Sequence, residues 1–290
     1  MLLSTQTSNA VARLGFEGGV TLLHNAGYDC LDLSLFEMVR DDSVYVADNW
    51  RQTVEERRKF ADANGIVFNQ SHAPFSFKWA DDTVREEIAK PRIIRSLEIA
   101  AMMGVKIAIV HPLHWFEYKG HEAEARQMNL EYYRGLIPYC REYGIKVAVE
   151  NMWQTEVKRK CTSDDVASRA ADLASYIDEI DSEWIVACLD LGHCGLVGEE
   201  AEDAIYTLGA DRLQALHVHD NDYLGDRHTL PGLGKMNWNA IMQALKDIGY
   251  RGELTYEADG FLKGFETDFF PQATAFMVQM GRYLLAKIGE

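Results

Sequence analysis

The chain alternates short apolar runs with longer stretches of helical periodicity along its whole length. Nearly continuous apolar runs, such as VKIAIV at 105–110 and IKVAV at 145–149, are typical of parallel strands buried on both faces. We predict eight strands, at Leu2–Thr5, Cys30–Phe36, Ile66–His72, Val105–His111, Ile145–Glu150, Ile185–Asp190, Leu213–His217 and Glu253–Glu257. Helical patterns lie between them, for example at Asp82–Met103, Ala123–Tyr143, Ser163–Asp181 and Trp238–Ile248.

Eight strand–helix units in 290 residues favour an α/β fold, a (β/α)8 TIM barrel forming a single domain over residues 1–290. Gly65, Gly104, Gly144 and Gly249 each precede a predicted strand, where a left-handed residue ends a helix. The alternative fold is a doubly wound open sheet. A dinucleotide-binding sheet of that kind carries a glycine-rich phosphate loop after its first strand, and no such loop follows Thr5.

Composition restricts the compartment and the partners. No run of about 18 apolar residues and no secretory signal is present, so we expect a cytoplasmic protein without a membrane partner. The net charge is −16, with 29 basic and 45 acidic residues, which disfavours nucleic acid as a partner. The five cysteines lack CxxC spacing, and we expect reduced core thiols at Cys30, Cys140, Cys161, Cys188 and Cys194.

Polar side chains stand at the carboxyl end of most predicted strands. In a TIM barrel these ends face one shared pocket. The residues concerned are His72, His111, His114, Glu150, Asn151, Asp190, His193, His217, His219, Asp220, Glu257 and Asp259. Burying so many ionisable groups together is costly unless a metal ion or a substrate satisfies them.

Four of these residues form a candidate metal site, because they end adjacent strands: Glu150, Asp190, His217 and Glu257. Three carboxylates and one imidazole suit one divalent ion, Mn²⁺, Mg²⁺ or Co²⁺, and also admit Zn²⁺. Alternation along the strand directs His219 the same way as His217, and we expect it to support the ligands from outside. Cys194 is expected only to pack.

Several motifs together resemble the xylose-isomerase-like TIM-barrel superfamily. They are HAP at His72, HP at His111, EN at Glu150, DLGH at Asp190, HVHDND at His217, DRHTLPGLG at Asp226 and YEAD at Glu257. This superfamily contains sugar-phosphate isomerases and epimerases, ketose 3-epimerases, inosose dehydratases, hydroxypyruvate isomerases and endonuclease IV-type AP endonucleases. The likeness spans the third to the eighth predicted strand.

The resemblance implies a divalent-metal-dependent sugar or sugar-phosphate isomerase or epimerase, with the metal on the four residues above. Glu150 and Glu257 would also be the catalytic acid/base pair, transferring a proton through a metal-stabilised enediolate. Return of the proton to the opposite face gives epimerisation, and return to the neighbouring carbon gives isomerisation; both remain open. The expected contacts to a small sugar or polyol-derived substrate are His72, His111, Trp115, Asn151, His193 and His228. Asp226 and His228 are possible extra metal ligands, and a homo-oligomer is expected.

Residues in four loops bear on the substrate. Trp79, Trp115 and Trp153 follow three successive strands and are expected either to pack on a sugar or to form a lid or a subunit contact. Ketose 3-epimerases of the superfamily carry an arginine six residues after the histidine of the seventh strand, where this chain has Tyr223. Gly232, Gly234 and Lys235 offer a candidate phosphate site in the PGLG segment.

Two rival functions remain. All nine positions that hold the trinuclear zinc cluster of the AP endonucleases are matched here, at His72, His111, Glu150, Asp190, His193, His217, Asp226, His228 and Glu257. The acidic charge opposes that function, because DNA-binding enzymes gain affinity from lysine and arginine at phosphates. The other rival is a carbohydrate-binding, lyase or deglycosidase subunit that uses the same metal beside a partner chain.

Overall fold

The computed structural model describes residues 1–289 and contains all eight predicted strands. Each predicted bound lies within two residues of the observed one. The barrel strands are β1 Leu3–Thr5, β2 Leu31–Ser34, β3 Phe68–His72, β4 Ile107–Val110, β5 Lys146–Glu150, β8 Ile185–Asp190, β9 Leu213–His217 and β10 Leu254–Tyr256.

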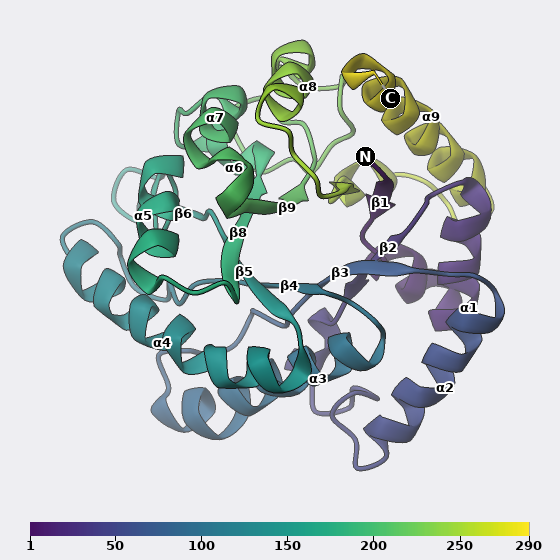
Figure 1. Cartoon of the computed structure of the whole chain (residues 1–290), viewed down its shortest axis with the longest axis horizontal. Coiled ribbons are helices and arrows are strands. Elements are labelled where there is room, and N and C mark those ends of the chain that lie inside the picture. The colour runs from purple at the N-terminus through teal and green to yellow at the C-terminus, as the bar shows by residue number, and fades with distance from the viewer. Residues whose placement is uncertain (290) are drawn as a thin grey trace.

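The strands close into a ring. Strands β2, β3, β4, β5, β8 and β9 form one parallel sheet, and β1 pairs in parallel with β10. Parallel bridges between Gln6 and Asp32 and between Val218 and Tyr256 join the two pieces on both sides. The helices surround this ring (Figure 1). The predicted TIM barrel is therefore confirmed, and a doubly wound open sheet is excluded.

The outer layer consists of the longer helices α1 Ser8–Ala26, α2 Trp50–Ala63, α3 Lys90–Met102, α4 Glu122–Tyr143, α5 Ala170–Ile180, α7 Ala201–Arg212, α8 Trp238–Asp247 and α9 Phe270–Ile288. Shorter helical segments are η1 Phe36–Val39, η2 Val84–Ala89, α6 Leu191–Leu196 and η3 Asp259–Leu262. Gly65, Gly104, Gly144 and Gly249 all have positive φ, which confirms the predicted left-handed helix ends. Within residues 1–289, every helix is too short or too polar to cross a bilayer.

Two predicted helices begin differently. The helix predicted at Ser163–Asp181 is wrong at its start, because residues 153–164 form an antiparallel hairpin of β6 Trp153–Thr155 and β7 Thr162–Asp164. Ala167 then adopts φ +55°, which helical backbone does not allow, and α5 begins only at residue 170. The stretch predicted as one helix from Asp82 is divided into the π-helical segment η2 and α3.

The barrel interior determines which residues reach the mouth. A small apolar cluster of Ile109, Ala148, Val186, Cys188 and Ala215 fills the ring. Side chains alternate along a strand, so Glu150, Asp190 and His217 also point inward, two residues beyond Ala148, Cys188 and Ala215. The carboxylates and the imidazole therefore lie above an apolar floor at the carboxyl ends of the strands.

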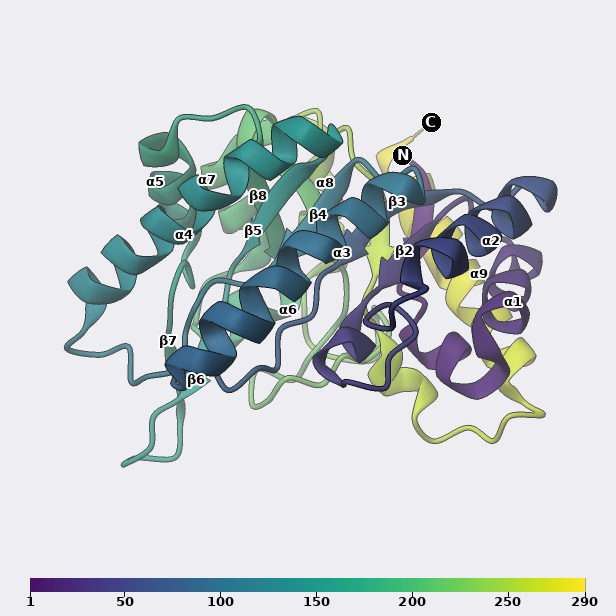
Figure 2. The ribbon, with the colours of Figure 1, turned by 90° about the horizontal axis from the view of Figure 1, so that it is seen from below.

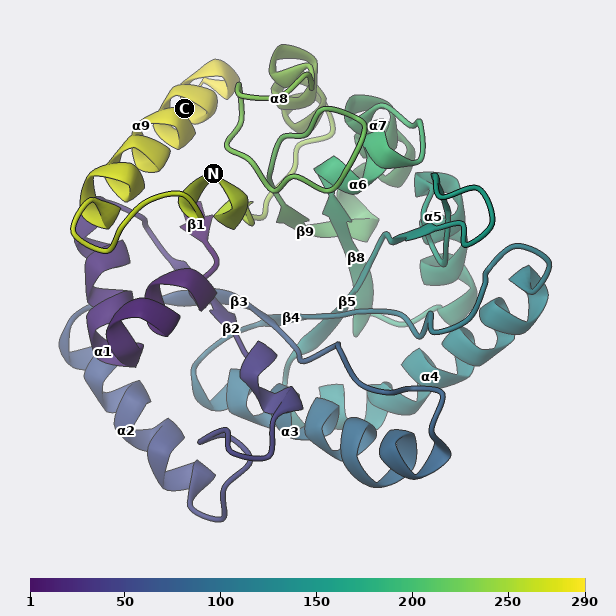
Figure 3. The same cartoon turned by 180° about the vertical axis from the view of Figure 1, so that it is seen from behind.

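The cysteines follow the prediction with one exception. All five are free thiols, and Cys30, Cys140, Cys188 and Cys194 are buried. Cys161 is exposed, because it lies in the turn segment between β6 and β7 and not in the core. This hairpin extends from the same side of the barrel as the loop before α8 (Figures 2 and 3).

Candidate active site

Four side chains converge at the carboxyl ends of β5, β8, β9 and β10. One potential ligand atom from each of Glu150, Asp190, His217 and Glu257 lies within 4.8 Å of the others. Nδ1 of His217 is 2.9 Å from Oε1 of Glu150 and 2.9 Å from Oε2 of Glu257. The predicted metal ligands therefore come together, and all but Glu257 are completely or almost completely buried.

This group suits a divalent cation. Nδ1 of His217 has at most one proton, yet it contacts two carboxylates. Oε2 of Glu150 is buried without a hydrogen bond of good geometry, although Nε2 of His111 lies 3.0 Å away. Burial alone would raise the pKa of Glu150, but the charge of His217 holds that pKa well below its usual range. Three ionised carboxylates this close together repel one another, and a bound cation would relieve both the repulsion and the missing contact.

His72 and His111 border the same carboxylate. Their Nε2 atoms are 3.1 Å apart, and Nε2 of His111 is 3.0 Å from Oε2 of Glu150. Nδ1 of His72 lies 2.8 Å from the carbonyl oxygen of Ala73, which fixes the ring. Burial lowers the pKa of His111 to about 4, so this ring is neutral near pH 7.

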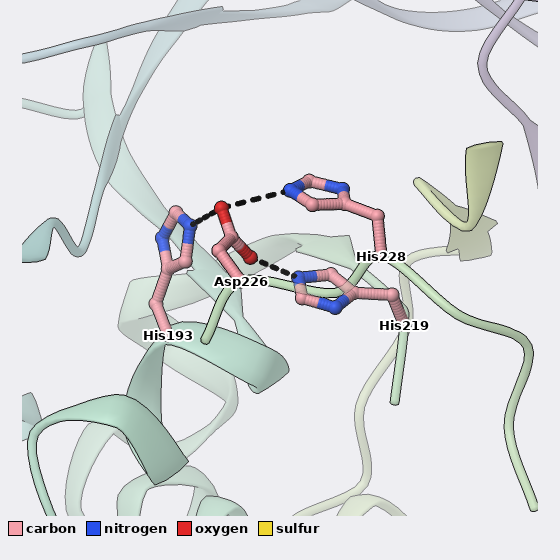
Figure 4. A group of neighbouring side chains, drawn as sticks. All are labelled: His193, His219, Asp226 and His228. Carbon is pink, nitrogen blue, oxygen red and sulfur yellow. Dashed lines mark hydrogen bonds and ion pairs between the residues drawn. The ribbon is translucent and has the colours of Figure 1, made fainter. Parts of the chain in front are cut away.

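A second group lies beside the first and consists of His193, His219, Asp226 and His228 (Figure 4). Asp226 stands between the three imidazoles, and its Oδ2 is 3.0 Å from Nε2 of His228 and 3.5 Å from Nε2 of His193. Burial opposes charge on His193 and His228, but the carboxylates of Asp190 and Asp226 raise the pKa of His193 to about 10, and Asp226 raises that of His228 to about 10. Nε2 of His219 is 2.9 Å from Oδ1 of Asp190, so His219 joins the two groups.

The loop that brings Asp226 and His228 to the site is anchored by Asp220. The buried Asp220 carboxylate accepts hydrogen bonds from the backbone N–H groups of Asn221, Gly232 and Met236 and from Nε1 of Trp238, at 2.8–3.2 Å. The N–H of Lys235 donates to the carbonyl of Asn221. Two of the N–H groups considered for a phosphate site, those of Gly232 and Lys235, are therefore used inside the loop.

Asp220→Ala is expected to lower the free energy of unfolding by at least about 3 kcal/mol, since it leaves several buried donors unpaired. The measurement is urea unfolding followed by circular dichroism. Asp268→Ala, at an exposed position before α9, is the control and should change that free energy by less than about 0.5 kcal/mol. A small effect of Asp220→Ala would show that the loop holds its shape by other means.

A cavity of about 450 Å³ opens over the group of Glu150, Asp190, His217 and Glu257. Eight of the predicted metal ligands and substrate contacts line it: His72, His111, Trp115, Glu150, His193, Asp226, His228 and Glu257. Asp190 and His217 lie beneath these. The loops after β3, β4 and β5 complete the lining with Phe75, Ser76, Phe77, Trp79, His114, Met152 and Trp153.

Two singled-out side chains do not face this cavity. Asn151 is completely buried, and its amide hydrogen-bonds to both the backbone N–H and the carbonyl of Asp190. Asn151 therefore positions Asp190 and does not make the predicted substrate contact. Tyr223 packs its ring on Gly195 and is absent from the lining. The arginine contact expected of ketose 3-epimerases therefore has no counterpart at this position.

Sequence reasoning missed two supporting residues on the first strands. Nε2 of Gln6, just after β1, donates to Oε1 of Glu257 at 2.7 Å. Asp32, on β2, is fully buried and accepts from Nε2 of Gln70 at 2.8 Å. Its Oδ2 lies 3.8 Å from Nε2 of His217. The sequence signal that could have identified both residues is a polar side chain on or just after an otherwise apolar strand.

The fold and this site together define a TIM-barrel protein with a carboxylate and histidine cluster at the carboxyl face of the barrel. Residues 20–268 match the family model of the xylose isomerase-like TIM barrel, and the chain belongs to that family. This confirms the resemblance drawn from the motifs.

Individual relatives are distant. A Methanocaldococcus jannaschii protein of unknown function is 27% identical over 192 residues, which cover 64% of this chain and 62% of that protein. A Sinorhizobium fredii protein is 28% identical over 49% of this chain and 43% of its own length, so the chain spans less than two thirds of both relatives. A D-psicose 3-epimerase of Enterocloster bolteae is 24% identical over 80% of this chain and 72% of the enzyme. Its name agrees with the enzyme class predicted from the sequence.

Solved structures share the fold at low identity. The 3-keto-D-glucoside 4-epimerase of E. coli has a TM-score of 0.72 at 18% identity, covering 96% of this chain and 99% of that one. The IOLI protein, solved with a bound zinc atom, has a TM-score of 0.73 at 16% identity and covers 99% of this chain and 98% of its own.

Proposed function

We propose that this protein is a divalent-metal-dependent epimerase or isomerase of ketoses or keto-sugars. The observation that carries the proposal is the convergence of Glu150, Asp190, His217 and Glu257 on one point at the floor of the cavity. The named relatives in the family, which are sugar epimerases, support the same class of reaction.

A divalent ion bound by these four residues would supply Lewis acidity to a substrate carbonyl and its neighbouring hydroxyl. The protein supplies the proton transfer. Glu150 extends from β5 and Glu257 follows β10, so the two carboxylates approach a substrate in the cavity from separate strands. One removes the proton from the carbon next to the carbonyl, and the other returns a proton to the opposite face. Gln6 holds Oε1 of Glu257, which leaves Oε2 directed to the site.

The lining favours a substrate without phosphate. It contains no lysine or arginine, its cationic His193 and His228 are paired with Asp226, and it also contains the carboxylates of Glu150 and Glu257. A phosphate group gains affinity from cations or from free N–H groups, and the loop after β9 uses its N–H groups internally.

Turnover in D₂O tests the proposal. We expect the Mn²⁺-loaded protein to place deuterium on the carbon next to the carbonyl of its substrate, because a carboxylate that has taken a proton exchanges it with solvent. The screen covers free and phosphorylated ketoses, aldoses and inososes, read by NMR and mass spectrometry. Conversion without label in every case would point to a hydride shift, and no conversion by a metal-loaded protein would contradict the proposal.

An AP endonuclease is the second candidate, because all nine positions of the zinc-cluster resemblance lie at one mouth, eight of them in the groups of potential ligands and His111 beside Glu150. Against it stand the net charge of −16 and a cavity lining without lysine or arginine. Gel-shift binding of abasic-site duplex DNA at physiological salt separates the two functions, and submicromolar affinity would favour the nuclease.

A further inference from the structure

One side of the cavity is built from aromatic side chains, which we call the aromatic wall: Phe75, Phe77, Trp79, Trp115 and Trp153. The wall comes from the loops after β3, β4 and β5. In the order of the ring, β3 lies across from β9 and β4 across from β10, the strands that carry or precede His217 and Glu257. The wall thus lies on the side of Glu150, which ends β5, and faces His217 and Glu257 across the mouth of the barrel.

The wall presents apolar surface to the cavity. All its members except Trp79 are partly exposed. The guanidinium of Arg85 lies 5.4 Å from the centre of the Trp115 ring and holds that ring in place. Aromatic surface left open to water is stabilised when a ligand with a flat apolar face covers it.

The cavity is larger than a free hexose requires. Twelve non-hydrogen atoms occupy roughly 360 Å³ even when each is given about 30 Å³, the volume of a whole water molecule. The cavity measures about 450 Å³. A hexose therefore fills only part of this open cavity.

His114 gives this wall one directed polar contact. Its Nδ1 donates to Oδ2 of Asp165 at 2.9 Å, and Asp165 is 1% exposed, with its other oxygen held by the N–H of Val166 at 2.8 Å. A carboxylate only accepts, so the pairing keeps a proton on Nδ1, and in the neutral ring Nε2 is then an acceptor. In the described chain Nε2 has no protein partner, and His114 lines the cavity.

We propose that the substrate is a ketose or keto-sugar with an aromatic substituent, which the aromatic wall binds while His114 accepts a hydrogen bond from an N–H or O–H group of that substituent. This inference rests on the proposed function and names the substrate class of the same site. The lining holds no lysine or arginine, and its cationic His193 and His228 are already paired with Asp226, which disfavours an anionic group as the main recognition element of the substituent.

The test compares D-fructose with 1-anilino-1-deoxy-D-fructose, which has the same carbonyl and adds a phenyl ring and an N–H group. With the Mn²⁺-loaded protein, kcat/KM for deuterium incorporation should be at least about tenfold higher for the anilino sugar, the scale of one buried aromatic group. Trp115→Ala and Phe77→Ala should each bring the ratio of the two kcat/KM values close to one, and His114→Phe should lower it. Phe276→Ala, on an exposed position of α9, should leave the ratio unchanged.

Direct binding of the anilino sugar, measured by isothermal titration calorimetry, provides a second readout that depends neither on turnover nor on the substituted tryptophan. Equal or better turnover of D-fructose would overturn the subsite and leave the proposed function standing. Binding that Trp115→Ala abolishes, without turnover of either sugar, would support the subsite and contradict the epimerase chemistry. Absence of both binding and turnover of the anilino sugar would overturn the subsite, and the wider substrate screen would then decide the function by itself.

Discussion

Glu150→Gln and Glu257→Gln are each expected to reduce turnover of the true substrate by at least about a hundredfold, the usual scale for loss of a general acid or base. An amide keeps an oxygen that coordinates a cation, but it cannot take up the proton of the substrate. Metal occupancy should therefore fall less than kcat. Both quantities are measured on the same preparations, by steady-state kinetics and by elemental analysis.

Glu266→Gln makes the same chemical change at an exposed position and is the matched control. It should keep full activity. If the two active-site variants retain near wild-type rates once saturated with metal, these carboxylates are only ligands, and the assignment of proton transfer to them is wrong.

Removal of the metal is expected to abolish activity and to destabilise the fold. Loss of a Lewis acid that contributes about 4 kcal/mol lowers the rate by roughly a thousandfold. An ion present at a thousand times its Kd stabilises the native state by about 4 kcal/mol, so chelation should also lower the thermal midpoint. Both effects should reverse when Mn²⁺ is added back to the chelated protein.

The same experiment counts the ions. We expect about one tightly bound ion per chain, and none in His217→Ala, whereas a change at His24 on α1 should leave the ratio intact. Three zinc ions per chain would instead indicate that the group around Asp226 is also a metal site and would favour the nuclease.

The barrel could be predicted from the sequence because its strands carry a strong signal. Segments such as 145–149 are apolar on both faces, and a helical pattern follows nearly every one. The β6–β7 hairpin could not be predicted in this way. Its strands are three residues long, partly exposed and mixed in composition, so no period distinguishes them from the start of a helix.

The convergence of the candidate metal ligands could be predicted for a related reason. Glu150, Asp190 and His217 end strands whose register is set by the buried residues before them, so their convergence follows from the pattern. His219 was expected only to support the ligands, but it also lies near Asp226. Asp226 comes from the long loop after β9, and alternation along the strand does not predict the path of that loop. The pairing of His114 with Asp165 joins residues 51 positions apart, and no local pattern records such a contact.

The separation of the aromatic wall from the carboxylates makes the protein modular. The reacting groups are fixed to barrel strands that depend on one another through the closed ring, whereas the wall is carried by three connecting loops. Exchange of residues 73–83, 112–120 or 152–168 for loops of another length or composition would retune selectivity while leaving the chemistry in place. Laboratory evolution of this scaffold toward new sugars should accordingly collect its substitutions in those three segments and spare the ends of β8, β9 and β10.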